Sequence, residues 1–109
     1  MEARERELRF FETEDDTAPC RDWLERLESS GNSMYGTILN RLDRVQSGNF
    51  GDCKNLKEGI WELRIDVGPG YRVYFGEDGD LVILLAGGTK QTQDRDIMTA
   101  RKYWSDYNA

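Results

Sequence analysis

A tight hairpin in the second half of the chain constrains the fold more than any other feature of the sequence. Residues 61–67 and 71–75 alternate between apolar and polar side chains, which is the period of a β-strand with two different faces. The segment Gly68-Pro69-Gly70 joins them, and its glycines can adopt the backbone angles that a short antiparallel turn requires. The two runs therefore predict adjacent antiparallel strands.

The alternation sorts the side chains of these strands into two sets, one for each face of the predicted sheet. The apolar set is Trp61, Leu63, Ile65, Val67, Tyr71, Val73 and Phe75. The set on the opposite face is Glu62, Arg64, Arg72 and Tyr74. We expect a helix to cover the apolar face and solvent to cover the other, where Arg64 would pair with Glu62 or Asp66.

Two further strands complete the predicted sheet. Residues 81–86 form a continuous apolar run, which is typical of a central strand covered on both faces, and the two glycines that follow should end it. Near the N-terminus, residues 5–11 alternate loosely between polar and apolar side chains. They predict a short first strand with Leu8 and Phe10 on one face.

Three segments have the 3.6-residue period of amphipathic helices. The first follows Thr17 as N-cap, places Pro19 in its first turn and ends near Gly31. The second ends at Gly48, and the short connection between the two predicts an antiparallel helical hairpin. The third spans residues 93–107. Their apolar stripes are Cys20, Trp23, Leu24 and Leu27, then Tyr35, Ile38, Leu39, Leu42 and Val45, and finally Ile97, Ala100 and Trp104.

The predicted order of elements is β-α-α-β-β-β-α, with a polar loop over residues 48–58. A chain of 109 residues has the length of one domain, so we expect residues 1–109 to form a single folding unit. The order predicts an α+β fold in which a small, mainly antiparallel sheet packs against helices.

Composition narrows the chemistry open to this chain. It contains no histidine, and Cys20 and Cys53 are far apart in the sequence, so we expect free thiols and neither a metal site nor a cofactor. Acid–base catalysis would then depend on tyrosine, lysine, arginine or a carboxylate. The N-terminus lacks the apolar segment of a secretory signal, and the longest apolar run is too short to cross a bilayer. We therefore expect a soluble protein of the cytoplasm.

A net charge of −6 argues against nonspecific attraction of nucleic acid, so a nucleic-acid site would need a local cluster of basic side chains. Lys90 follows the last predicted strand and should lie near Arg64 and Arg72, with Tyr74 and Glu62 beside them. These residues fit either the solvated face of an ordinary sheet or a phosphate-binding cluster. The pattern by itself favours the solvated face.

Two blocks of the sequence, LKEGIWELRIDVGPGYRVYF and LVILLAGGTKQTQDRDIMTARKYW, resemble the RelE/ParE superfamily of bacterial toxins, in its phage-derived HigB-like branch. The resemblance extends from about Gly48 to Trp104, and the predicted β-α-α start is consistent with it. It implies a RelE/ParE-like fold and the toxin of a type II toxin–antitoxin module. It also implies a partner, an antitoxin with a helix-turn-helix DNA-binding domain.

Toxins of this superfamily that are enzymes cut messenger RNA, commonly on the ribosome, without a metal. The resemblance implies that Arg72, Arg64 and Lys90 stabilise the scissile phosphate, Arg72 being the arginine of the Gly-Tyr-Arg motif. Tyr74 and Glu62 are the nearby candidates for proton transfer, although some relatives have a basic residue at the position of Glu62. Two alternatives stay open: a ParE-like toxin that inhibits DNA gyrase without catalysis, and a toxin fold that has lost its activity.

Overall fold

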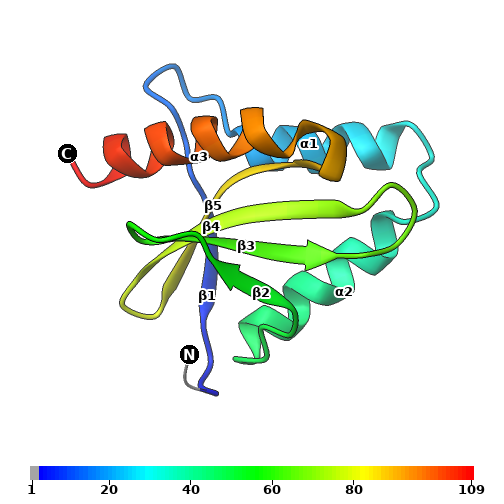
Figure 1. Cartoon of the computed structure of the whole chain (residues 1–109), viewed down its shortest axis with the longest axis horizontal. Helices are drawn as coiled ribbons and strands as arrows, with labels where there is room; N and C mark the ends of the chain where they lie inside the picture. The colour runs from blue at the N-terminus through cyan, green and yellow to red at the C-terminus, as the bar shows by residue number, and fades with distance from the viewer. Residues whose placement is uncertain (1–2) are drawn as a thin grey trace.

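Within residues 3–109, which the computed structural model describes, the chain forms a five-stranded sheet with helices on both faces (Figure 1). The elements are β1 (Glu7–Phe10), α1 (Pro19–Ser29), α2 (Tyr35–Gln46), β2 (Cys53–Asn55), β3 (Ile60–Ile65), β4 (Tyr71–Asp78), β5 (Leu81–Thr89), the 3₁₀ helix η1 (Lys90–Thr92) and α3 (Gln93–Tyr107). The strand order is β1-β5-β4-β3-β2, and only the β1–β5 pair among these is parallel. The predicted α+β architecture, with a mainly antiparallel sheet packed against helices, is confirmed.

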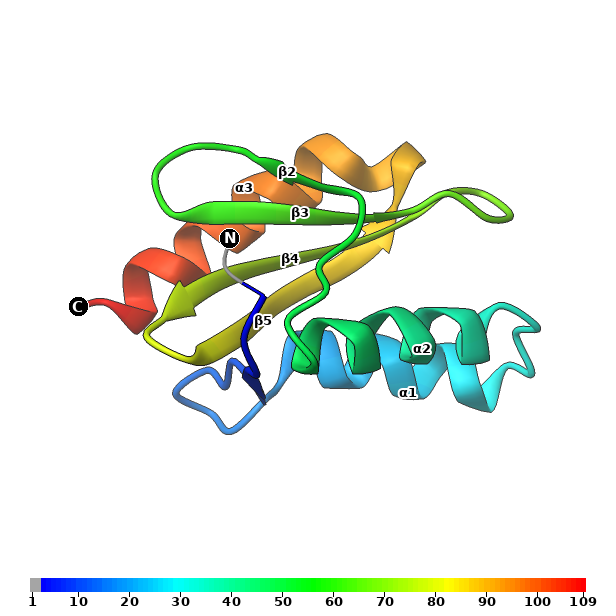
Figure 2. The ribbon, with the colours of Figure 1, turned by 90° about the horizontal axis from the view of Figure 1, so that it is seen from below.

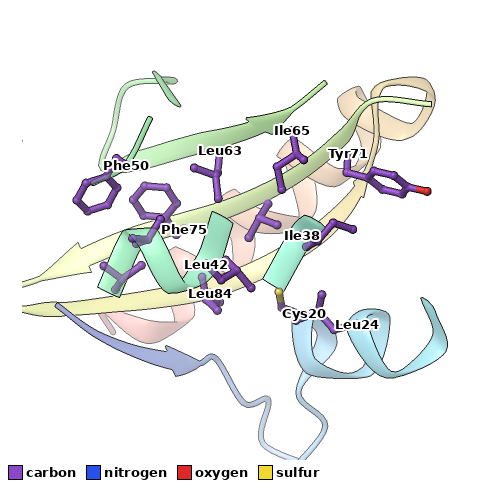
Figure 3. Close-up of a cluster of buried hydrophobic side chains, with 13 residues drawn as sticks. Cys20, Leu24, Ile38, Leu42, Phe50, Leu63, Ile65, Tyr71, Phe75 and Leu84 are labelled. Atoms are coloured by element: carbon purple, nitrogen blue, oxygen red, sulfur yellow. The ribbon is translucent and has the colours of Figure 1, made fainter. Parts of the chain in front are cut away.

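The first face of the sheet packs against α1 and α2, which lie side by side and run in opposite directions (Figure 2). The core between them combines the helical stripes with the apolar set of the hairpin, as predicted. Figure 3 shows Leu42 of α2 beside Leu84 of β5, with Ile38 of α2 and Leu63 of β3 in the same cluster. The buried members of this core are Cys20, Leu24, Ile38, Leu42, Val45, Phe50, Leu63, Ile65, Tyr71, Val73, Phe75, Val82 and Leu84.

The opposite face is not exposed to solvent, which corrects the sequence-based expectation. Helix α3 lies across β3, β4 and β5 and buries a second core that includes Tyr74 and Ala100. Glu62 and Tyr74 are fully buried, and Arg72 is 5% exposed. The expectation failed because a strand face with charged side chains looks solvated in isolation, whereas the apolar stripe of α3 needs a sheet face to cover it.

Strand β5 continues through Gly87 and Gly88 to Thr89, so the prediction that these glycines end it was wrong. Their role is close packing. A methyl group at Gly87 would overlap the indole of Trp23, and one at Gly88 would overlap the carboxylate of Asp96.

Two details near the sheet edges also differ from the predictions. Residues 48–58 contain β2, a short strand that pairs with β3; its polar sequence gave no apolar alternation to reveal it. Phe10 is 38% exposed, whereas the next residue, Phe11, is buried and stacks on Tyr103 of α3. Strand β1 ends at Phe10, and the side chain of Phe11 is the one that enters the core.

The remaining features agree with the sequence more closely. Pro19 is the first residue of α1, although Ala18 rather than Thr17 is the N-cap. Within the described part of the chain, Cys20 and Cys53 form no disulfide, as predicted. Among the residues that the structure describes, no helix is both long enough and apolar enough to cross a membrane.

Candidate functional site

The hairpin turn places two arginines directly opposite each other. Gly68 and Gly70 both have positive φ angles, of 53° and 79°, which only glycine adopts without strain. The resulting register pairs Arg64 of β3 with Arg72 of β4. Like charges at directly opposed positions destabilise a sheet, so this pair needs either compensating carboxylates or an anionic ligand.

The positive charge of Arg64 is balanced by a carboxylate on its own strand. Its Nε donates to Oε1 of Glu62 at 2.9 Å, one of the two pairings expected from the sequence. The hydrogen bond from Arg64 to Glu62 raises the pKa of the guanidinium, which therefore stays charged at any physiological pH. The side chain is 32% exposed, so part of it remains open to a ligand.

Glu62 is a fully buried carboxylate held on both oxygens. Oε2 accepts a hydrogen bond of 2.7 Å from Nε2 of Gln93, the first residue of α3, while Oε1 accepts the bond from Arg64. Burial by itself would raise the pKa of Glu62, but the hydrogen bonds from Gln93 and Arg64 outweigh burial and lower this pKa. The group is therefore an anion that fixes its neighbours.

The positive charge of Arg72 is balanced by Asp66, which follows β3 at the start of the hairpin turn. Its Nη1 donates to Oδ1 of Asp66 at 2.9 Å and to the carbonyl oxygen of Tyr71 at 3.0 Å. Its Nε is buried and has no hydrogen-bond partner among the described residues. Since Asp66 is largely exposed, an anion can replace this carboxylate at Arg72 without burying it.

Lys90 is the exposed cation of the group. Its backbone N–H donates to the carbonyl oxygen of Gly70 at 2.7 Å, which fixes η1 to the hairpin turn. A methyl group added at Gly70 would lie 3.4 Å from Cβ of Lys90 and 3.5 Å from Nη1 of Arg72. Gly70 therefore sits between these two side chains, and the structure brings Lys90 and Arg72 together as the sequence predicts.

Tyr74 lies beneath these cations rather than among exposed groups. Its hydroxyl is buried and has no hydrogen-bond partner of good geometry, although it lies near the carboxylate of Glu62. Burial and the negative charge of Glu62 both raise the pKa of Tyr74, so the phenol is protonated at neutral pH. A protonated phenol cannot act as a base.

Two structural supports of the site were not foreseen from the sequence. Oγ1 of Thr92 donates to Oδ2 of Asp96 at 2.5 Å, and this pair fixes the first turn of α3 over Gly88. From α2, Nη1 of Arg41 donates to the carbonyl oxygen of Arg64 at 2.6 Å. The first bond joins residues four apart at the start of α3, whereas the second joins residues 23 apart in the sequence.

The arrangement suits binding and stabilisation of a phosphate. Arg64 and Arg72 lie opposite each other on neighbouring strands, and the backbone of Lys90 is bonded to the turn that joins these strands. Arginine can hold a phosphate with two parallel hydrogen bonds. Within residues 3–109, no group of three Cys, Asp or Glu side chains has an arrangement that could hold a metal ion. The main chemistry that Arg64, Arg72 and Lys90 offer is stabilisation of negative charge.

The pH dependence of stability provides a test of the buried Glu62. Its folded pKa lies below its usual value of 4.5, so the stability it contributes is present above pH 4.5 and is lost as the pH falls through the folded pKa. We expect Glu62→Gln to melt at a lower temperature than the wild type at pH 7, and this difference to shrink between pH 4.5 and pH 3. Thermal denaturation of both proteins across this range measures it. A difference that stays constant with pH would show that Glu62 is not ionised in the fold.

Comparison with known proteins identifies a family to which this sequence is similar. A family model described as phage derived protein Gp49-like matches residues 22–104, which is most of the chain and includes every residue of the candidate site. A protein of Haemophilus influenzae, described as an uncharacterized protein, is 51% identical over 80 residues. That match covers 72% of this chain and 79% of the Haemophilus influenzae protein.

Proposed function

This chain belongs to the Gp49-like family of phage-derived proteins, and we propose that it is the toxin of a type II toxin–antitoxin module. The family is related to toxins of toxin–antitoxin systems. The finer placement in the RelE/ParE superfamily, HigB-like branch, is supported by the two sequence blocks that carry the hairpin and the segment from β5 to α3. Both blocks lie within the matched region.

The proposed activity is cleavage of messenger RNA on the ribosome without a metal. The 2′-oxygen of a nucleotide attacks the adjacent phosphorus while the bond to the 5′-oxygen breaks, which leaves a 2′,3′-cyclic phosphate and a 5′-hydroxyl. One proton leaves the 2′-hydroxyl and one joins the departing 5′-oxygen. The observation that carries this proposal is the register that sets Arg64 opposite Arg72 with Lys90 attached to the same turn.

Each cation has a distinct role in this proposal. Arg72 and Arg64 stabilise the negative charge that develops on the phosphate oxygens, as preorganised donors do in a partly water-excluded site. Lys90 is more exposed and neutralises the approaching RNA backbone. Asp66 pairs with Arg72 through an exposed side chain, so the incoming phosphate displaces it.

Glu62 and Tyr74 have a supporting role in this arrangement. Neither has exposed surface, and both oxygens of Glu62 already accept hydrogen bonds. Direct proton transfer to RNA by either group would require the first turn of α3 to move away. As arranged, Glu62 anchors Arg64, and the positive charges supply the catalysis.

The buried state of these two residues also favours a second candidate function. A toxin that inhibits DNA gyrase by binding needs no proton-transfer group, and Glu62 and Tyr74, the two candidates for proton transfer, have no exposed surface. In that case the same three cations would contact the negatively charged surface of a protein partner.

Controlled expression in growing bacterial cells separates the two functions. We expect protein synthesis, measured by incorporation of a labelled amino acid, to fall within minutes of induction, before any change in DNA integrity. Induction of the DNA-damage response with translation still running would support gyrase inhibition and contradict the ribonuclease. Co-expression of the neighbouring gene should prevent the arrest if that gene encodes the proposed helix-turn-helix antitoxin. The proposed site of action is the cytoplasm.

A further inference from the structure

We propose that Gln93 is a positioning residue of the RNA site, which acts through Glu62 to hold Arg64 in its phosphate-binding orientation. This inference rests on the proposed ribonuclease function, because it assigns a role to one more residue of the same site. Gln93 is the first residue of α3, on a different element from the hairpin that carries both arginines.

The geometry forms a relay of three side chains. Nε2 of Gln93 donates to Oε2 of Glu62 at 2.7 Å, and Nε of Arg64 donates to Oε1 of the same carboxylate at 2.9 Å. Each carboxylate oxygen thus has its own donor, and the carboxylate cannot rotate without breaking both bonds. Gln93 therefore fixes the plane of the acceptor to which Arg64 is attached.

The nitrogen through which Arg64 binds Glu62 determines which of its other nitrogens can bind RNA. It binds Glu62 through Nε, so its two terminal nitrogens, Nη1 and Nη2, donate to no side chain or carbonyl group among residues 3–109. Nη1 and Nη2 are the atoms that can hold a phosphate in a two-bond contact. The relay holds the inner edge of the guanidinium and leaves its outer edge open to RNA.

Burial makes this relay rigid. Glu62 has no exposed surface, so water cannot take the place of Gln93 in the fold as it stands, whereas the side chain of Arg64 is 32% exposed and would otherwise sample several rotamers. The position of Gln93 is in turn fixed, because Thr92 and Asp96 bond to each other across the first turn of α3. The arrangement links the start of α3 to the orientation of a cation on β3.

The test uses Gln93→Met, which keeps the length of the side chain and removes the donor. Gln91→Met is the matched control, because Gln91 is an exposed glutamine of η1 with no side-chain hydrogen bond among the described residues. We expect Gln93→Met to slow cleavage of a reporter message in a cell-free translation system about tenfold, as a displaced catalytic group does. Gln91→Met should cleave at the wild-type rate.

Two further measurements distinguish positioning from a merely structural role. In the Arg64→Ala background, Gln93→Met should cause no additional loss of cleavage, since its effect passes through Arg64. In the NMR spectrum, the Nε–H signal of Arg64 should be protected from solvent exchange in the wild type and should lose that protection in Gln93→Met. The Gln91→Met protein should keep the wild-type signal.

The inference is overturned if Gln93→Met cleaves at the wild-type rate, or if it lowers cleavage equally with and without Arg64. An unchanged Arg64 signal in Gln93→Met would overturn it as well. Failure of the proposed function gives a different result: the wild-type protein would then leave the message intact, while the Arg64 signal would still report whether the relay exists.

Discussion

Arg72→Ala is expected to lower RNA cleavage by roughly 10²–10³-fold and to abolish growth arrest on expression, because it removes one preorganised donor to the transition-state charge. The side chain lies near the start of β4, the middle strand of the sheet, opposite Arg64. One of its terminal nitrogens is already oriented by Asp66 and by the carbonyl oxygen of Tyr71. Cleavage of a reporter message in a cell-free translation system measures the loss of activity.

The fold should survive this substitution. Arg72 loses hydrogen bonds to an exposed carboxylate and to one carbonyl group, which we expect to cost about 1–2 kcal/mol of unfolding free energy. Arg72→Lys keeps the positive charge without the planar fork and should recover only part of the activity. Arg44→Ala, at an exposed arginine of α2, serves as the control and should stay fully toxic. A folded Arg72→Ala protein with full toxicity would exclude Arg72 from the site.

Gly76→Ala is expected to destabilise the fold by about 1–3 kcal/mol, the usual cost of forcing an extra carbon into a well-packed core. The six-membered ring of Trp104 lies against the backbone at Gly76, and an added Cβ would be only 2.5 Å from its Cζ3 atom. Either the ring or the whole of α3 must then move. Each kcal/mol should lower the melting temperature of a domain of this size by roughly 4–8 °C.

Gly36→Ala is the matched control for this prediction. Gly36 is an exposed residue of α2, and an added Cβ would meet nothing within 4 Å. Alanine is the better helix former there, so this variant should gain roughly 0.5–1 kcal/mol. If both variants melt at the wild-type temperature, α3 is not packed against β4 as described.

The hairpin was predictable from sequence because two independent signals agree on it. A strand period of two fixes which side chains share a face, and the Gly68-Pro69-Gly70 turn fixes the register. Arg64 and Arg72 therefore fall opposite each other without any information from the rest of the chain. Lys90 joins them because β5 returns alongside β4 and ends beside the turn.

The burial of the polar face was not predictable in the same way. Glu62 and Tyr74 have the sequence pattern of a solvated strand face, and only the docking of α3 puts them in the interior. The sequence shows the apolar stripe of α3, but the helical period does not indicate which face of the sheet this stripe will cover. Gln93 was missed for the same reason, because its partner Glu62 lies 31 positions away in the sequence.

The most direct test of the proposed ribonuclease is to map the 5′-hydroxyl ends of cellular RNA shortly after induction of the protein. Attack by a 2′-hydroxyl generates this end at every cut, so we expect new 5′-hydroxyl ends within translated messages of wild-type cells. The same sites should be uncut in cells that express Arg72→Ala. Growth arrest by the wild-type protein without any new 5′-hydroxyl ends would contradict the account.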